Sequence, residues 1–164
     1  NLEAIDVLKV LKQEKDRYIP LEEVSLVMAG ELLELAEEAA PGTGYESAKK
    51  ELESGKAYKK FQKLIAAQKG NPDIQVSDIK VGEIKHDVVA EKEGIVKDIE
   101  NSVVKEVAHA LGTPNVKSAG IYLSKQIGEK FEKGDILFTL YTTSETRLDL
   151  GLKILKLKDM MVLG

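Results

Sequence analysis

Residues 68–74 read Gln-Lys-Gly-Asn-Pro-Asp-Ile, and the spacing of the hydrophobic residues changes across this stretch. Before it, apolar residues recur every three or four positions, which is typical of amphipathic helices. After it, short runs alternate between apolar and polar residues, which is typical of strands. The Asn-Pro-Asp turn predicts a boundary between the two patterns. The sequence therefore indicates an α+β fold, with a helical N-terminal segment followed by a β-rich C-terminal module.

Four helices are expected before this boundary. The first carries apolar residues at helical spacing from Leu2 to Leu11, and Pro20 interrupts the pattern that follows it. The second runs from about residue 21 to residue 40. Two shorter helices follow at about 45–54 and 57–68, each ending just before a glycine. For the second helix the spacing predicts a buried stripe, formed by Val24, Val27, Met28, Leu32, Leu35, Ala36 and Ala39.

The β-rich module is expected to begin near residue 74. Short alternating runs are predicted between residues 74 and 89, around Ile79 and Val81 and at residues 84–88. Further strands are predicted at residues 94–99, 120–123 and 135–141, with turns at Gly128-Glu129 and Lys133-Gly134-Asp135. A helix around 103–111 and a second around 148–155 interrupt them, and residues 160–163 form a short terminal strand. Neither an internal repeat nor a low-complexity segment is visible in the sequence.

Composition excludes several classes of function. The chain has 164 residues, with 24 Lys and Arg against 28 Asp and Glu, so its net charge is −4. Basic residues are scattered, which leaves no electrostatic footprint for nucleic acid. Cysteine is absent, which excludes disulfides, thiolate catalysis and cysteine-ligated zinc and fits a reducing cytoplasm. Apolar runs such as Val24–Gly30 are far shorter than a membrane span, and no signal peptide is visible, so no membrane partner is expected.

Two histidines are the candidates for a metal site or for acid–base chemistry. His86 falls on the same side of a predicted strand as Ile84 and Val88, so we expect it at the edge of a core. His109 shares the solvated face of a predicted helix. Because no third ligand stands at a characteristic spacing, we assign neither histidine to a metal.

The remaining polar motifs also favour structural roles. Pro41-Gly-Thr-Gly-Tyr45 has glycine amides before a helix, but it lacks both phosphate-loop spacings, so we interpret it as a linker between helices. Tyr122 and Tyr141 offer hydroxyls on predicted strands, where half-buried tyrosines are common. The carboxylate clusters lie at helix ends or turns, where solvation accounts for them; they are Glu22-Glu23, Glu37-Glu38 and Glu91–Glu93. No Ser/His/Asp set can be assembled.

Two hypotheses about function follow from the β-rich module. Residues 127–137 follow the pattern of the biotinyl and lipoyl carrier hairpins, in which Gly-Asp turns separate the strands of a flattened barrel. A carrier needs an exposed lysine in the hairpin after this unit, whereas Tyr141-Thr-Thr-Ser-Glu145 contains none. The carrier hypothesis therefore agrees with the expected fold, but the sequence lacks the lysine to which the carried group would be attached. A covalent mass increase on the isolated protein would identify it as a carrier.

The second hypothesis is part of an enzyme, and it rests on motifs that occur in order along nearly the whole chain. They are Asn1-Leu-Glu-Ala4, Glu53-Ser-Gly-Lys-Ala-Tyr-Lys-Lys-Phe61, Ala67-Gln-Lys-Gly70, Gly94-Ile-Val-Lys-Asp-Ile99, Ala110-Leu-Gly112, Gly120-Ile-Tyr-Leu-Ser-Lys-Gln-Ile-Gly128 and Lys133-Gly-Asp-Ile-Leu137. Together they resemble the C-terminal portion of the thymidine/pyrimidine-nucleoside phosphorylase family. The segment Thr113-Pro-Asn-Val-Lys-Ser-Ala-Gly-Ile121 departs from the bacterial pattern and is similar to archaeal members, which include AMP phosphorylases.

The resemblance implies phosphorolysis, in which inorganic phosphate attacks C1′ of a nucleoside or nucleotide and the base departs. It also implies a C-terminal module of barrel-sandwich/hammerhead type, used for packing or subunit contact in a homo-oligomer. Residues 1–70 are expected to be helices of the parent enzyme's large α/β domain, and 74–164 its C-terminal module. No cofactor is implied beyond phosphate as co-substrate.

The family's phosphate loop and base-binding groups lie upstream of the Asn1 motif, so no catalytic, cofactor-binding or metal-binding residue is transferred to this chain. We expect a noncatalytic part of a phosphorylase, preceded in its gene by a Gly before Asn1 and a Gly/Ser/Lys-rich loop further back. The Asn1 side chain is expected to cap the first helix.

Overall fold

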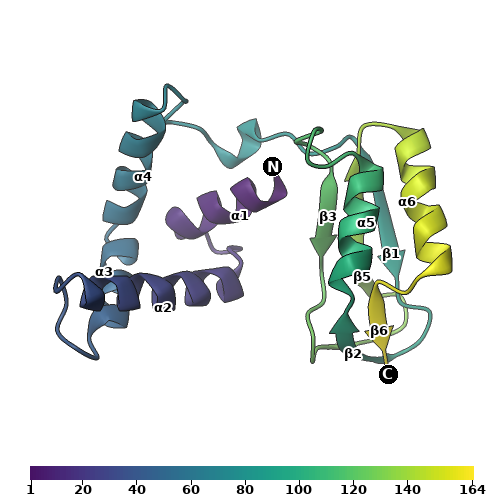
Figure 1. The fold of residues 1–164 in the computed structure, drawn as a ribbon, viewed down its shortest axis with the longest axis horizontal. Helices are drawn as coiled ribbons and strands as arrows, with labels where there is room; N and C mark the ends of the chain where they lie inside the picture. The colour runs from purple at the N-terminus through teal and green to yellow at the C-terminus, as the bar shows by residue number, and fades with distance from the viewer. The chain divides into compact units, whose positions relative to one another are not determined.

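The computed structural model describes residues 1–164 and divides into two compact units. Residues 3–79 form the first, which we call the helical unit. Residues 80–164, together with Asn1 and Leu2, form the second, which we call the β-rich unit. Figure 1 labels most of the elements of both units along the chain. The α+β organisation predicted from the sequence is confirmed.

The helical unit contains the four expected helices and one short 3₁₀ turn. They are α1 (Leu2–Leu11), α2 (Ile19–Leu35), α3 (Gly44–Glu53), α4 (Lys56–Ala67) and η1 (Val76–Asp78). Pro20 lies in the first turn of α2, where the missing amide donor would have no helical partner in any case. The helix was expected at about residues 21–40, but it begins two residues earlier and ends five residues earlier, so the expectation is wrong at both ends. Glu37 adopts a left-handed conformation, with φ of 59°, just beyond its last turn.

The predicted buried stripe of α2 is wrong. Five of its members are between 52% and 80% exposed, and they are Val24, Val27, Met28, Leu32 and Leu35. The buried positions of α2 are instead Glu22, Leu26 and Gly30 on the other side of the helix. Because α2 is apolar on both sides, hydrophobic spacing alone does not tell which side faces the rest of this unit.

The close approach of α3 decides which side of α2 is buried. A Cβ atom at Gly30 would lie 2.6 Å from the backbone nitrogen of Tyr45, so only glycine allows this contact. Leu26 then joins Val10, Ala48 and Leu52 in the small core of the helical unit. The sequence signal for this packing was the pair Gly30 and Gly44, and it outweighs the stripe of larger apolar residues.

An ion-pair network allows Glu22 to be buried at the start of α2. Its Oε2 accepts hydrogen bonds from Nε of Arg17 at 2.5 Å and from Nε2 of Gln13 at 2.6 Å. A second Arg17 nitrogen donates to Oε1 of Glu22 at 3.1 Å. The Arg17 guanidinium, assisted by the Gln13 amide, lowers the pKa of the Glu22 carboxyl below its ordinary value of 4.5, against the opposing effect of burial.

Replacing Glu22 by glutamine should make the stability of the helical unit less dependent on pH. Because the folded-state pKa is lowered, the carboxylate's contribution is fully present above pH 4.5 and is lost as the pH falls through the folded value. We expect Glu22→Gln to lower the free energy of unfolding at pH 7 by about 1.5 kcal/mol. Urea denaturation at pH 7 and pH 3 measures both effects, with exposed Glu46→Gln as control. Equal losses at both pH values would contradict this assignment.

The β-rich unit contains two three-stranded antiparallel sheets and two helices. Its elements are β1 (Ile84–Val89), β2 (Gly94–Ile99), α5 (Asn101–Leu111), β3 (Gly120–Leu123), β4 (Lys130–Phe131), β5 (Ile136–Thr142), α6 (Glu145–Leu157) and β6 (Met161–Leu163). The strand orders are β1-β5-β3 and β4-β2-β6. The strands predicted at 84–88, 94–99, 120–123, 135–141 and 160–163 and both predicted helices are present, with ends that differ by at most three residues. The alternating run around Ile79 and Val81 forms no strand, and the two-residue strand β4 was not predicted.

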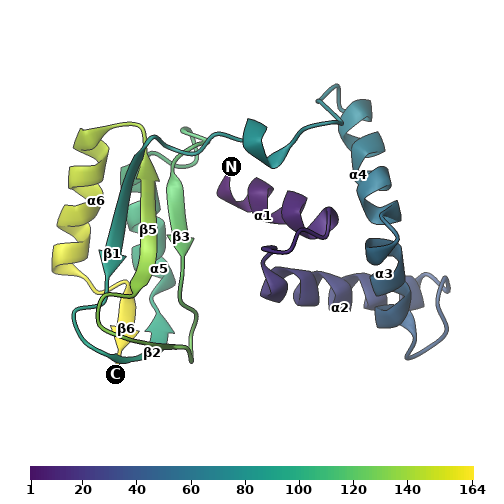
Figure 2. The same ribbon diagram turned by 180° about the vertical axis from the view of Figure 1, so that it is seen from behind.

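The core of the β-rich unit lies between the β1-β5-β3 sheet and the two helices. Both α5 and α6 cover the same face of that sheet, as Figure 1 shows from the helix side and Figure 2 from the sheet side. Val107 and Leu111 of α5 and Leu140 of β5 are completely buried there. None of the helices combines the length and apolar composition that a bilayer crossing needs.

Candidate functional site

A group of polar side chains in the β-rich unit lies on the face of the β1-β5-β3 sheet opposite the helices. Asp87 of β1 and Tyr122 of β3 both pair with Thr139 of β5, so the three residues form one row across the sheet. The Thr139 hydroxyl donates to Oδ1 of Asp87 at 2.7 Å. Nζ of Lys85 lies 3.1 Å from Oδ2 of the same carboxylate. This row is the candidate site that the fold assembles from distant segments.

The electrostatics of the row keep its acid ionised. The hydrogen bond from Thr139, followed by the bond from Lys85, lowers the pKa of Asp87 below its ordinary range. Both carboxylate oxygens already have partners within the sheet. An ionised, internally paired carboxylate is poorly suited to donate or to accept a proton near neutral pH. The arrangement therefore supports a structural role, and it does not by itself supply a nucleophile with a base.

Tyr141 lies on the same face, next to Gly120 and near the side chain of Leu2. Its cross-strand partner is Gly120, and a Cβ atom at Gly120 would lie 2.9 Å from Cδ1 of Leu2. The Leu2 side chain therefore occupies the space that Gly120 leaves open. Tyr122 and Tyr141, whose hydroxyls were predicted on strands, thus lie on one face of the sheet.

The Asn1 side chain is held by the β-rich unit. Its Nδ2 donates to the carbonyl oxygen of Lys80 at 2.6 Å, and its backbone nitrogen donates to that of Lys117 at 2.9 Å. The side-chain amide and the backbone nitrogen thus bind Asn1 to two segments that lie far away in the sequence. Its predicted capping of α1 stays a prediction.

The two histidines lie apart and in different surroundings. His86 pairs with the buried Leu140 across the sheet and is half-buried, which confirms its predicted place at the edge of the core. His109 is exposed on α5, as predicted. No group of three or more His, Asp or Glu side chains is arranged to hold a metal ion.

The Pro41–Gly44 linker binds an anion, but that anion is a side chain of the protein. The amides of Gly42 and Gly44 donate to the Glu34 carboxylate at 2.9 Å and 2.7 Å. These bonds, the first of them from Gly42, lower the pKa of Glu34. The interpretation of the segment as a linker between helices is confirmed. The glycine amides that make it resemble a phosphate loop are the ones that bind Glu34. Sequence reasoning missed Glu34, ten residues before Gly44.

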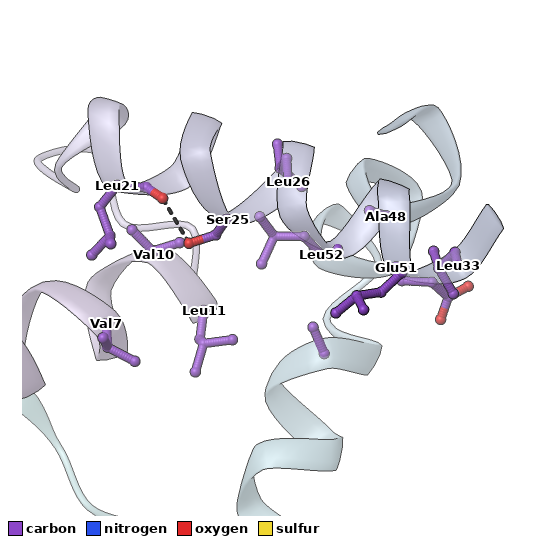
Figure 3. Close-up of a pocket in the computed structure, with 13 residues that line it drawn as sticks. Val7, Val10, Leu11, Leu21, Ser25, Leu26, Leu33, Ala48, Glu51 and Leu52 are labelled. Atoms are coloured by element: carbon purple, nitrogen blue, oxygen red, sulfur yellow. Dashed lines mark hydrogen bonds between the residues drawn. The ribbon is translucent and has the colours of Figure 1, made fainter. Parts of the chain in front are cut away.

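A groove lined almost entirely by apolar side chains lies in the helical unit. It has a volume of about 470 Å³, and Figure 3 shows Val7, Val10 and Leu11 of α1 lining it together with side chains of α2 and α3. Its polar members are already engaged: the Ser25 hydroxyl donates to the carbonyl of Leu21, and Glu51 pairs with Lys56. Such a groove suits apolar contact and provides no group that would perform chemistry.

The place where a carrier protein would hold its modified lysine does not form a hairpin. Tyr141 and Thr142 end β5, and the chain then enters α6 at Glu145. Residues 141–145 therefore connect a strand to a helix and contain no lysine.

Comparison with known proteins points to one enzyme family. A family model described as "Pyrimidine nucleoside phosphorylase C-terminal domain" matches residues 95–158. The AMP phosphorylase of Methanocaldococcus jannaschii is 39% identical over 156 residues, covering 95% of this chain and 31% of that protein. The putative thymidine phosphorylase of Legionella pneumophila is 40% identical over 165 residues, covering 100% of this chain and 31% of that protein. The AMP phosphorylase of Pyrococcus abyssi is 40% identical over 148 residues, covering 90% of this chain and 29% of that protein.

These relatives are similar to both units of the chain, since the matches cover nine tenths or more of its residues. The chain spans about three tenths of the length of these curated relatives. Most of each relative therefore has no counterpart in the residues described above.

Proposed function

Because the chain belongs to the pyrimidine nucleoside phosphorylase family and corresponds to its C-terminal portion, we propose that it serves a phosphorolytic pentosyltransferase as a noncatalytic part. The observation that carries this proposal is the similarity along the whole chain to AMP phosphorylases and to a putative thymidine phosphorylase. The substrates are a nucleoside or nucleotide and inorganic phosphate, and the products are the free base and a pentose 1-phosphate or ribose 1,5-bisphosphate.

The chemistry of such a reaction explains why we place the catalytic groups elsewhere. Attack of phosphate at C1′ passes through an oxocarbenium-like state, so the enzyme must hold phosphate and must stabilise the leaving base. The two best-formed polar groups of this chain are occupied internally. Asp87 is bound by Thr139 and Lys85, and the anion-binding amides of Gly42 and Gly44 hold Glu34.

The two units have distinct roles in this proposal. Residues 1–70 are helices of the enzyme's large α/β domain, and residues 74–164 are its C-terminal module, of barrel-sandwich/hammerhead type, used for packing or subunit contact in a homo-oligomer. The enzyme acts in the cytoplasm. The two antiparallel sheets with α5 and α6 support the assignment of a separate C-terminal module.

An assay of the purified 164-residue chain tests this proposal. With phosphate and AMP, CMP, UMP, thymidine or uridine, we expect no phosphate-dependent release of free base. Separation of bases from nucleosides and nucleotides by liquid chromatography provides the measurement. Release of a base that depends on phosphate and grows with the concentration of the chain would overturn the proposal that this part is noncatalytic.

A further inference from the structure

Four lysines lie along one side of α4 and surround a hollow in the surface of the helical unit. They are all exposed and recur every three or four positions, at Lys56, Lys59, Lys60 and Lys63. Together with Glu51 and Ala57 they line a hollow of about 510 Å³, which we call the lysine hollow. Basic residues are scattered over the sequence as a whole, but the helical spacing of α4 gathers these four in one place.

The opposite side of α4 makes the contacts that hold the helix in its unit. Tyr58, Phe61 and Ile65 are half-buried there. The Tyr58 ring is also covered by Lys12, whose Nζ lies 5.9 Å from the ring centroid. The lysine side of α4 is therefore not needed for packing, and the tyrosine is not free to stack on a ligand in the hollow.

The lysine hollow carries an excess of positive charge. Nζ of Lys56 pairs with Oε1 of Glu51 at 2.8 Å, and Glu51 is the only acid in the lining. Lys59, Lys60 and Lys63 have no ion-pair partner, so three positive charges remain uncompensated. Like charges three or four residues apart on a helix repel each other. A bound anion would relieve this repulsion, and an anion with several charges would relieve most of it.

The length of the lysine row indicates which kind of anion fits it. Lys56 and Lys63 are seven residues apart, which corresponds to about 10 Å along the helix axis. A single phosphate can contact only part of such a row, whereas a short chain of linked phosphates can extend along it. Lysine binds phosphate groups as a point charge and needs no fixed geometry to do so.

Nucleic acid fits the hollow less well than a short phosphate chain. Proteins that bind single strands combine a basic groove with aromatic side chains on which the bases stack. The lining of the lysine hollow contains no aromatic residue, and the nearby Tyr58 is on the other side of the helix. The hollow can thus hold phosphates but offers nothing that would hold bases.

We propose that the lysine hollow of α4 binds a short linear oligophosphate, in contact with Lys59, Lys60 and Lys63. This inference goes beyond the proposed function and does not rest on it. The site is formed entirely by residues of the helical unit, and its ligand is distinct from the single phosphate that phosphorolysis consumes.

Calorimetric titration of the full 164-residue chain with inorganic tripolyphosphate tests the proposal. We expect saturable binding of one tripolyphosphate per chain, which weakens as the salt concentration rises. Replacing Lys59 and Lys63 together by glutamine should weaken binding by about tenfold or more, because two of the three uncompensated charges are lost. Glu51→Gln should strengthen it, because Lys56 is then free to contact the ligand.

The matched control replaces two other exposed lysines, Lys105 of α5 and Lys156 of α6, by glutamine. This pair changes the net charge by the same amount but lies in the β-rich unit. We expect it to bind tripolyphosphate as the wild type does. Circular dichroism should show the same helix content for all variants, since each replaced lysine is exposed.

Several results would overturn the proposal. They are the absence of saturable binding by the wild type, an equal loss of affinity in the control pair, and orthophosphate binding as tight as that of tripolyphosphate. Tighter binding of an oligouridylate with the same number of phosphates would identify nucleic acid as the ligand, and tighter binding of oligoglutamate would identify an acidic peptide. Either would overturn it too. Because the titration involves no nucleoside and no turnover, its failure would leave the proposed function untouched.

Discussion

Replacing Leu140 by alanine should lower the free energy of unfolding of the β-rich unit by about 2–5 kcal/mol. Leu140 lies on β5, the central strand of its sheet, and its side chain is completely buried. It shares the core with Val107 and Leu111 of α5. The substitution would leave a cavity in this core. Because β5 is paired with β1 at His86 and with β3 at Ile121, the strand has little freedom to move and close that cavity.

Urea denaturation followed by circular dichroism measures this loss, and hydrogen exchange of the β5 amides assigns it to the β-rich unit. Leu157→Ala is the control, since the same atoms are removed from a side chain that is 84% exposed. We expect that variant to stay within about 0.5 kcal/mol of wild type. Similar losses for the two variants would show that Leu140 does not lie in a tightly packed core.

Gly30→Ala should destabilise the helical unit by about 1–3 kcal/mol, although alanine is the better helix former. The added Cβ would lie 2.6 Å from the backbone nitrogen of Tyr45 and 2.8 Å from the carbonyl carbon of Gly44. Backbone atoms cannot rotate away as the end of a side chain can. The variant therefore forces α2 and α3 apart and opens the small core formed by Leu26, Ala48 and Leu52.

Gly151→Ala provides the matched control inside α6. It brings the same gain in helix propensity, but the new Cβ would meet only side-chain atoms of Leu111 and Val107, the nearest being Cδ2 of Leu111 at 3.3 Å. A side-chain end can shift by the required few tenths of an ångström, so we expect a much smaller effect. Thermal unfolding of both variants, with hydrogen exchange of α2 and α3, makes the comparison. A Gly30→Ala protein as stable as the Gly151→Ala protein would contradict the close packing of α2 on α3.

The order and type of the elements could be predicted from the sequence, because turns and glycines mark their ends. Strands β2 and β3 match the predicted residues, β1, β5 and β6 differ by one position, and β4 was not predicted. The burial of α2 could not be predicted in the same way. Its larger apolar residues suggested one side, whereas the contact that forms depends on Gly30, Gly44 and Tyr45, which lie on two different helices.

The contacts of the polar side chains could not be predicted from the sequence either. Asp87, Thr139 and Tyr122 are separated by long stretches of sequence, and only the antiparallel register places them in one row. The anion held by the Pro41–Gly44 linker is a glutamate of the preceding helix, which no spacing motif describes. In contrast, His86 and His109 could be placed correctly, because strand alternation and helical spacing alone decide on which side they lie.

Reconstitution tests most directly our proposal that this chain supports phosphorolysis performed by groups outside it. The measurement is phosphate-dependent release of adenine from AMP by the complex of the 164-residue chain with the unmatched portion of the Methanocaldococcus jannaschii enzyme, and by each part alone. We expect release by the complex and none by the chain alone. Release by the chain alone, or a complex that forms and stays inactive with every nucleoside and nucleotide tested, would contradict it.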